Sequence, residues 1–175
     1  MIVACGFDHA GYVLRPRLLS LIEVEGHEVL DFGTDRPDPI DYPDKALEVG
    51  LAVAGGRAER GIIVCGSGAG VSVAACKIKG VRAATIHVTY TAHQGVEHDA
   101  VNVLCLGGRV IGVEVAVDVV TAFLRAVTSG EQRHVRRRAK VDEIERTGGV
   151  GARLDLIGPW GERIGDDQGS GAGKG

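Results

Sequence analysis

Residues 60–70 read RGIIVCGSGAG, an apolar run that passes directly into a turn with glycines at three alternating positions. The run is apolar almost throughout, which is typical of a strand that is covered on both faces. The turn at residues 66–70 leads into an Ala- and Val-rich segment, residues 69–79, that predicts a helix. A strand that enters a helix through such a turn indicates a parallel α/β fold.

The same alternation of short apolar runs and longer helical runs extends along the chain. Strands are predicted at residues 2–6, 28–33, 61–66, 82–86 and 102–107. Helices are predicted at residues 12–25, 43–54, 69–79, 113–127 and 131–146. Repeated strand–helix–strand units favour an α/β fold with a Rossmann-like, doubly wound sheet of about five parallel strands, flanked by helices and followed by a C-terminal helix.

Length and composition exclude several classes of protein. The 175 residues suit one domain with an appendage, and 45% apolar residues can form a hydrophobic core. We expect a domain at residues 1–146 and a flexible, Gly-rich C-terminal extension at residues 147–175. The sequence has no apolar run long enough to span a membrane and no signal-peptide pattern, and a net charge of −3 does not attract nucleic acid. A cytoplasmic protein without membrane or nucleic-acid partners is expected.

In an open parallel sheet, ligands bind beyond the carboxyl ends of the strands, near the point where the strand order reverses. Polar or Gly-rich stretches follow four of the predicted strands: residues 7–11, residues 33–34 leading to 41–43, residues 65–70, and, somewhat later, residues 97–99. These stretches are the candidates for a functional site.

The turn at residues 66–70 is the most informative candidate. Alternating glycines allow the backbone to approach a ligand with its N–H groups, and the N-terminus of the following helix adds positive partial charge. Such a turn binds a phosphate or an oxyanion formed during a reaction, although a tight strand-to-helix turn needs small residues too. A dinucleotide site is disfavoured because Val71 occupies the third Gly position of GxGxxG.

Cys65 ends its strand directly before this turn, where nearby amides favour a thiolate. It is therefore a candidate base or nucleophile, the alternative being a buried strand-end cysteine. Ser67 either transfers a proton or satisfies the turn. The remaining cysteines are expected in the core: Cys5, Cys76 and Cys105.

Other polar residues also have a functional and a structural interpretation. His98, between two acidic residues, is either a general acid or a surface histidine. Asp8 and His9 either transfer protons, or Asp8 caps the following helix. Arg133 and Arg137, four residues apart on one helical face, either bind a phosphate or form a solvated basic face.

Together these motifs resemble the ribose-5-phosphate isomerase B family, within the group that includes galactose-6-phosphate and allose-6-phosphate isomerases. The matching stretches are GFDHAGY (6–12), GHEVLDFGT (26–34), DYPD (41–44), RGIIVCGSGAGVSVAACKIKGVRAA (60–84), EHDAVNVLCLGGRVIG (97–112) and RHVRRRAKV (133–141). The resemblance covers about residues 1–146, in order.

The resemblance implies an aldose–ketose isomerase of a phosphorylated sugar that uses no cofactor and no metal, with ribose 5-phosphate and ribulose 5-phosphate as the first expectation. It implies that Cys65 moves a proton between C2 and C1 through a cis-enediolate and that Ser67 assists at the oxygens. The amides that would stabilise the intermediate are those of Gly66, Gly68 and Gly70.

The resemblance also implies that His98, helped by Asp8, opens the furanose ring and that Tyr42 lines the sugar pocket. The implied phosphate ligands are His9, Arg109, Arg133 and Arg137. In this family the pocket lies between two subunits, so a homodimer or homotetramer is implied.

Three features differ from the family pattern. Asp99, a residue that the resemblance places at the substrate, stands where the family usually has Asn. Residues 86–95 differ from the usual run, and Phe7 takes a place that is often Ser or Ala. These differences lie at the sugar end of the expected site. Two alternatives are therefore considered: the same chemistry on a tetrulose 4-phosphate or a 6-phosphohexose, and a non-catalytic subunit that binds a sugar phosphate.

Overall fold

The computed structural model describes residues 1–149 and contains a sheet of five parallel strands in the order β2-β1-β3-β5-β4. The strands are β1 (Ile2–Phe7), β2 (Glu28–Asp31), β3 (Arg60–Cys65), β4 (Ala83–Thr85) and β5 (Val103–Gly107). Since β2 and β3 lie on opposite sides of β1, the strand order reverses between β1 and β3.

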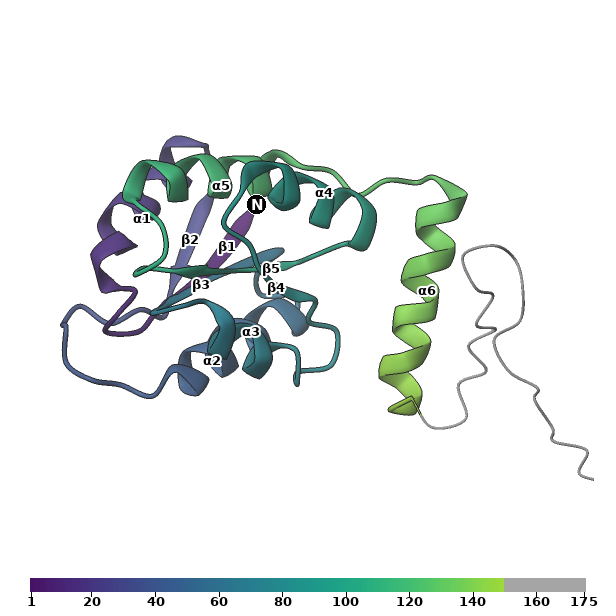
Figure 1. Cartoon of the computed structure of the whole chain (residues 1–175), viewed down its shortest axis with the longest axis horizontal. Coiled ribbons are helices and arrows are strands. Elements are labelled where there is room, and N and C mark those ends of the chain that lie inside the picture. The colour runs from purple at the N-terminus through teal and green to yellow at the C-terminus, as the bar shows by residue number, and fades with distance from the viewer. Residues whose placement is uncertain (150–175) are drawn as a thin grey trace, which may run out of the picture. The chain divides into compact units, whose positions relative to one another are not determined.

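Helices cover both faces of this sheet (Figure 1). The first face carries a 3₁₀ helix, η1 (Tyr12–Leu14), and the helices α1 (Arg15–Val24), α4 (Thr89–Asp99) and α5 (Val113–Arg125). The second face carries α2 (Tyr42–Ala54) and α3 (Ala69–Ala75). The predicted doubly wound α/β fold is therefore confirmed.

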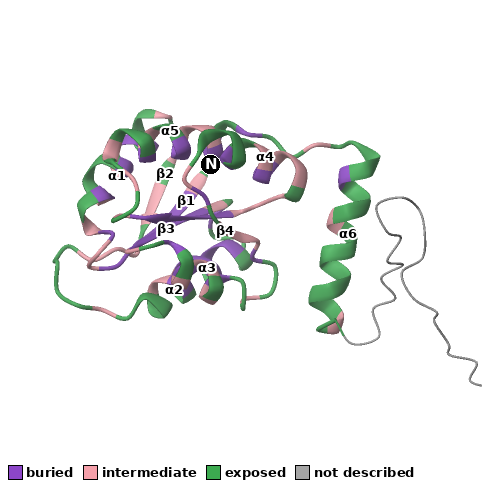
Figure 2. Ribbon diagram, viewed as in Figure 1, coloured by how far each residue is buried: buried purple, intermediate pink, exposed green. Residues whose placement is uncertain are grey.

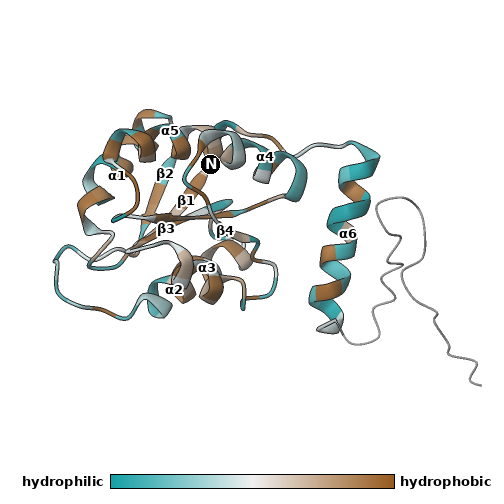
Figure 3. Ribbon diagram, in the orientation of Figure 1, coloured by the Kyte–Doolittle hydropathy of each residue, from teal (hydrophilic) through white to brown (hydrophobic). Residues whose placement is uncertain are grey.

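Two apolar clusters fill the space between the sheet and its two helical layers. In β3, Ile62 and Val64 pack toward the first face, whereas Ile63 and Cys65 pack toward the second. Both sets are buried, so the strand is apolar throughout rather than alternating. Figure 2 shows the buried residues on the central strands and on the sheet-facing sides of the helices, and Figure 3 shows the same regions as hydrophobic. This alternation directs the Cys65 side chain toward α2 and α3.

The described chain divides into two compact units, of which the first is Met1–Arg138 and the second begins at Ala139. The last helix, α6 (Gln132–Thr147), begins in the first unit and continues into the second. Residues 150–175, which hold most of the predicted flexible extension, lie outside the described residues, so the predicted boundary at residue 146 stays a prediction. Within residues 1–149, every helix is too short or too polar to cross a membrane.

Helix α4 is the main element that the sequence pattern does not predict. Its buried face consists of three small side chains, Ala92, Gly95 and Val96, which form only a weak apolar stripe, and Gly95 and Val96 also have low helix propensity. The helix carries the chain from the carboxyl end of β4 back to the amino end of β5. Residues 97–99 therefore lie at the amino ends of the strands, and the prediction that they belong to the carboxyl-end group is wrong.

Candidate active site

A cavity of about 410 Å³ lies at the carboxyl ends of β1 and β3, where the strand order reverses. It is lined by Asp8, Tyr42, Cys65, Gly66, Ser67, Gly70, Arg109 and Val110. All of these except Val110 were singled out by the sequence. Val110 is a half-exposed valine in the loop after β5, and its residue type carries no chemical signal.

Cys65 lines the cavity, although the residue is only 5% exposed. Its Sγ accepts a hydrogen bond from the Gly68 N–H at 3.1 Å, and a donor at this position stabilises negative charge on sulfur. Cys5 and Cys105 are fully buried as predicted, and burial raises the pKa of both thiols. Cys76 is exposed, so its predicted place in the core is wrong. Of the four cysteines, Cys65 is the one that lines the cavity.

Two glycines of the turn, Gly68 and Gly70, meet different steric demands. Gly68 has a φ of +80°, in the left-handed region that side chains avoid. A Cβ on Gly70 would lie 2.9 Å from the Tyr42 ring, so only glycine allows the two residues to pack this closely. The Ser67 hydroxyl accepts the Ala69 N–H at 3.3 Å, which keeps the serine in the turn while its side chain lines the cavity.

The loop after β5 supplies a cation to the same cavity. The Arg109 N–H donates to the Gly66 carbonyl at 3.1 Å, and the Gly108 N–H donates to the Cys65 carbonyl at 2.7 Å. The Arg109 guanidinium lies over Gly66. The loops after β3 and β5 are thus joined by backbone hydrogen bonds, which fix the position of Arg109 relative to the thiol.

Asp8 serves both as a turn residue and as a wall of the cavity. Its Oδ1 accepts the N–H groups of Ala10 and Gly11, each at 2.8 Å, so the carboxylate caps the turn that precedes η1. His9 does not line the cavity, since its Nδ1 accepts the Ile40 N–H at 3.3 Å and ties it to the loop before α2. A neutral His9 then carries its proton on Nε2.

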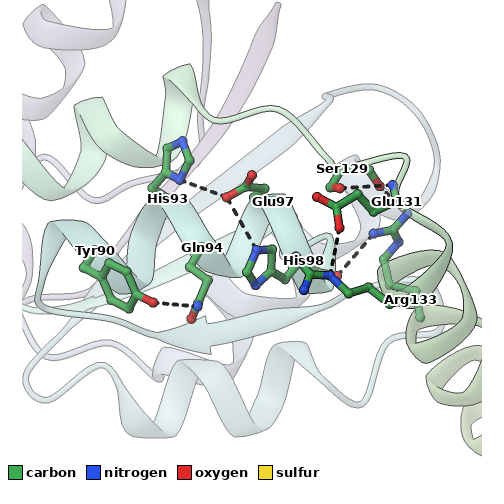
Figure 4. A network of polar contacts seen from close by, with 9 residues as sticks. Tyr90, His93, Gln94, Glu97, His98, Ser129, Glu131 and Arg133 are labelled. Atoms are coloured by element: carbon green, nitrogen blue, oxygen red, sulfur yellow. Dashed lines mark hydrogen bonds and ion pairs between the residues drawn. The ribbon is translucent and has the colours of Figure 1, made fainter.

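A second group of predicted residues gathers where α4 ends and α6 begins (Figure 4). The His98 ring stacks on the ring of His134, with centroids 3.9 Å apart, and its Nε2 lies 3.6 Å from Glu97 Oε2. The same Glu97 oxygen lies 3.4 Å from His93 Nδ1. His134 is 2% exposed, and burial, followed by the neighbouring His98 and Arg133, lowers its pKa.

The basic residues of α6 are exposed around this histidine pair. Arg133 forms an ion pair with Glu131 at 2.8 Å, and Arg137 is exposed on the same helix. Arg138 instead holds the α4 end in place, because its guanidinium donates to the carbonyls of His98 and Ser129 at 3.2 and 2.9 Å. Two arginine side chains therefore stay accessible to an anionic ligand.

The two groups lie at opposite edges of the sheet in a single chain. Asn102, just after α4, accepts the Gly61 N–H at 2.8 Å and donates to the Arg82 carbonyl at 3.1 Å, which places it at the amino ends of β3 and β4. Cys65 lies at the other end of β3, and strands of five or six residues span roughly 16–20 Å. One chain therefore does not bring His98, Asp99, Arg133 and Arg137 to the Cys65 cavity.

Two further residues, which were not among the predicted site residues, hold the backbone around the cavity: Thr85 bonds to the Gly-rich turn and His87 to the end of β5. The Thr85 hydroxyl donates to the Gly68 carbonyl at 2.9 Å, and His87 Nε2 accepts the Gly107 N–H at 2.9 Å. Both residues end or follow β4, at the carboxyl edge where ligands bind in such folds. For His87 that position was a usable signal, since it directly follows the strand predicted at residues 82–86, whereas Thr85 lies inside that predicted strand.

Comparison with known proteins places this architecture among sugar-phosphate enzymes. The model of the Ribose/Galactose Isomerase family matches residues 3–141. A protein of Escherichia coli (strain K12) named Ribose-5-phosphate isomerase B is 40% identical over 144 residues, which cover 82% of this chain and 96% of that protein. A Pectobacterium atrosepticum protein named D-erythrulose-4-phosphate isomerase is 36% identical over 130 residues, or 73% of this chain and 85% of that protein.

The fold agrees with the same group. The structure of ribose-5-phosphate isomerase B from Clostridium thermocellum superposes with a TM-score of 0.81 at 42% identity, covering 85% of this chain and 99% of that chain. The family match spans β1 to the first half of α6, and so includes both groups of predicted site residues. On sequence, fold and cavity together, the chain belongs to the Ribose/Galactose Isomerase family.

Proposed function

We propose that this protein interconverts ribose 5-phosphate and ribulose 5-phosphate by moving a proton between C2 and C1. The observation that carries the proposal is the position of the Cys65 thiol, which lines the cavity at the strand-order reversal and accepts the Gly68 N–H. A base that removes a proton from carbon must lie in the wall of the substrate cavity. Amide donors beside the base stabilise the oxyanion that develops. The similarity to proteins named ribose-5-phosphate isomerase B supports the choice of substrate.

The chemistry can be written with the residues of this cavity. The Cys65 thiolate removes the proton from C2 of the aldose, and negative charge develops on O1 as the enediolate forms. The amides of the turn at residues 66–70 stabilise that charge. The thiol then returns its proton to C1, while the O2 hydroxyl proton passes to O1 with help from Ser67, and the ketose results.

The remaining steps need residues from a second copy of the chain. His98 opens the furanose ring, assisted by Asp8, while Arg133 and Arg137 bind the phosphate, with Arg109 from the cavity and His9 from the turn after β1. Because the His98 group lies at the opposite edge of the sheet, a two-fold pair of subunits would place one subunit's group over the other's cavity. A homodimer, or a tetramer built from such dimers, follows from this arrangement.

Replacement of the thiol tests the base assignment. Cys65→Ala lowers kcat by about 10²- to 10⁴-fold, the usual contribution of a positioned base, and leaves the binding of ribose 5-phosphate intact. Turnover is followed by ribulose 5-phosphate formation, and binding by calorimetry on the inactive variant. Near-full turnover in Cys65→Ala would show that another group is the base.

Mixing two inactive variants tests the shared site. Cys65→Ala and His98→Asn chains, unfolded together and refolded at equal amounts, form mixed dimers in which one of two sites is intact, so activity recovers to about a quarter of the wild-type value. Each variant refolded alone is the control. Absence of recovery, with mixed dimers confirmed by native mass spectrometry, would place all the site residues in one chain.

The same cavity is also a candidate for a four-carbon substrate, because one relative is named D-erythrulose-4-phosphate isomerase. Comparison of kcat/KM over four-, five- and six-carbon sugar phosphates separates the candidates, and a preference for the tetrulose above about tenfold would replace the ribose assignment. Exchange of the C2 proton with solvent, measured by NMR, distinguishes an isomerase from a subunit that only binds the sugar phosphate.

A further inference from the structure

We propose that His87, together with Thr85, is a positioning residue for the proposed isomerase reaction. From the end of β4, the two residues hold the turn at residues 66–70 and the loop after β5, which carries Arg109, in position beside the Cys65 thiol. This inference rests on the proposed function and adds residues that touch neither the cavity nor the proposed substrate. The evidence is a continuous set of hydrogen bonds that runs from β4 to the thiol.

The first link joins β4 to the loop after β5. The Gly107 N–H donates to His87 Nε2 at 2.9 Å. Gly107 lies against the Ser67 backbone so closely that an added Cβ would be 2.8 Å from the Ser67 carbonyl carbon. The next residue, Gly108, donates its N–H to the Cys65 carbonyl at 2.7 Å. A shift of Gly107 would therefore move both the serine and the strand end that carries the thiol.

The second link joins β4 to the turn itself. The Thr85 hydroxyl donates to the Gly68 carbonyl at 2.9 Å, while the Gly68 N–H donates to Cys65 Sγ at 3.1 Å. A Cβ on Gly68 would lie 2.9 Å from the Thr85 side chain and 3.2 Å from the Gly107 nitrogen. Gly68 is thus held between Thr85 and Gly107. The direction of the Gly68 N–H toward the Cys65 sulfur therefore depends on both residues.

The hydrogen bond defines the protonation state of His87. An Nε2 that accepts an N–H must be deprotonated, so the neutral ring carries its proton on Nδ1. Burial also lowers the pKa of His87, which favours the same neutral form. A glutamine, whose carbonyl oxygen reaches about as far as Nε2, can replace this acceptor, whereas leucine cannot.

Two readouts on the full-length protein test the inference. His87→Leu is expected to lower kcat at least about tenfold with KM within about twofold, because displaced oxyanion donors and base act on the transition state. It is also expected to slow alkylation of Cys65 by iodoacetamide at pH 7.5 at least about threefold, because the N–H directed at sulfur is lost. The alkylation is measured in a Cys76→Ser background, since Cys76 is the exposed cysteine.

The conservative variant distinguishes a positioning role from a general structural one. His87→Gln is expected to restore both readouts to within about twofold of the parent, because it keeps the acceptor for Gly107. His27→Leu, in the turn before β2, is the matched control and is expected to leave both readouts unchanged. Thr85→Val, which keeps the side-chain shape and removes the hydroxyl that donates to Gly68, is expected to slow alkylation as His87→Leu does and is informative even if His87→Leu fails to fold.

Each contrary outcome has a definite meaning. The inference is overturned if Cys65 is alkylated at the parent rate or faster in both His87→Leu and Thr85→Val. It is also overturned if His87→Gln folds but has kcat and an alkylation rate as low as those of His87→Leu. If the parent protein isomerises none of the sugar phosphates, the proposed function fails. The alkylation rates still decide the role of His87 in that case, because they require no sugar.

Discussion

Gly70 shows how a single hydrogen atom in place of a side chain shapes the cavity. The Tyr42 ring occupies the space that a Cβ at this position would need, at 2.9 Å. Tyr42 is 42% exposed and begins α2, so its ring can swing outward without unfolding the core. The width of the cavity therefore depends on contact between the ring and the glycine.

The prediction at this position separates pocket shape from stability. Gly70→Ala displaces the Tyr42 ring, raises KM for the sugar phosphate and lowers kcat about tenfold, while thermal unfolding changes little. Gly112→Ala is the control, because an added Cβ at Gly112 meets nothing within 4 Å. Steady-state kinetics and calorimetry on both variants check this; equal KM values would mean that the ring does not define the pocket.

Much of the candidate site could be predicted from the residue types at the carboxyl ends of the predicted strands. Cys65, Ser67 and Asp8 follow strands that the apolar pattern identifies, and the rule for open parallel sheets then places them at the binding edge. His98 was placed at the wrong edge because its position depends on the direction of α4. Thr85 and His87 were not selected, because their hydrogen-bond partners are backbone groups distant in sequence; only the position of His87 after a predicted strand was a local signal.

At the scale of elements, the end of α5 is held by a side chain from a strand. The Arg60 guanidinium, at the start of β3, donates to the carbonyls of Phe123 and Ala126 and lies 5.1 Å above the Phe123 ring. The last carbonyls of a helix have no partner within the helix, so this arginine satisfies groups that would otherwise be unpaired. Burial lowers the pKa of Arg60, which still stays charged.

Removal of that guanidinium should destabilise the protein. Arg60→Leu lowers the free energy of unfolding by about 2–3 kcal/mol, because two charge-assisted hydrogen bonds are lost and the carbonyls become unpaired. Urea denaturation measures the change. Arg125→Leu is the matched control: it breaks an exposed ion pair with Glu25 and should shift the urea midpoint much less. Similar shifts in both variants would contradict the role assigned to Arg60.

Helix α4, which the sequence pattern does not predict, shows that residues close in sequence do not always determine a helix. The segment TYTAHQGVEHD (89–99) contains aromatic, β-branched and Gly residues, all of which lower helix propensity. Its helical conformation comes from packing: Ala92 and Val96 are buried in the cluster with α1 and α5. Helix α5 has the opposite character, with five buried residues on one strongly apolar face, and it was predicted to within two residues.

At the scale of the whole molecule, two histidines with lowered pKa values make stability depend on pH. Burial is the main cause of the lowered pKa of both His87 and His134, and for His134 the neighbouring His98 and Arg133 add to it. In the unfolded chain these histidines titrate near pH 6.5. Below that pH the unfolded state binds more protons than the folded state, so the free energy of unfolding falls as pH decreases. Above it, both groups are neutral in both states and contribute no pH dependence.

The corresponding prediction uses a variant that keeps the aromatic ring. Wild-type Tm is expected to fall between pH 7.5 and pH 5.5, and His134→Phe should reduce that fall because phenylalanine stacks on His98 without titrating. Differential scanning calorimetry at the two pH values measures the difference. His93→Phe, at an exposed histidine of α4, is the control and should keep the wild-type dependence. An unchanged slope in His134→Phe would exclude that residue as the source.

The strand order also determines when, during synthesis on the ribosome, the sheet can form. The strands β2 and β3 both pair with β1, one on each side, so the first 65 residues already contain three adjacent strands. The edge strand β4 pairs only with β5, which is translated later and inserts beside β3. A nascent chain that stops before residue 103 therefore carries β4 without a partner, and that exposed edge is a point where chaperones or neighbouring nascent chains can bind.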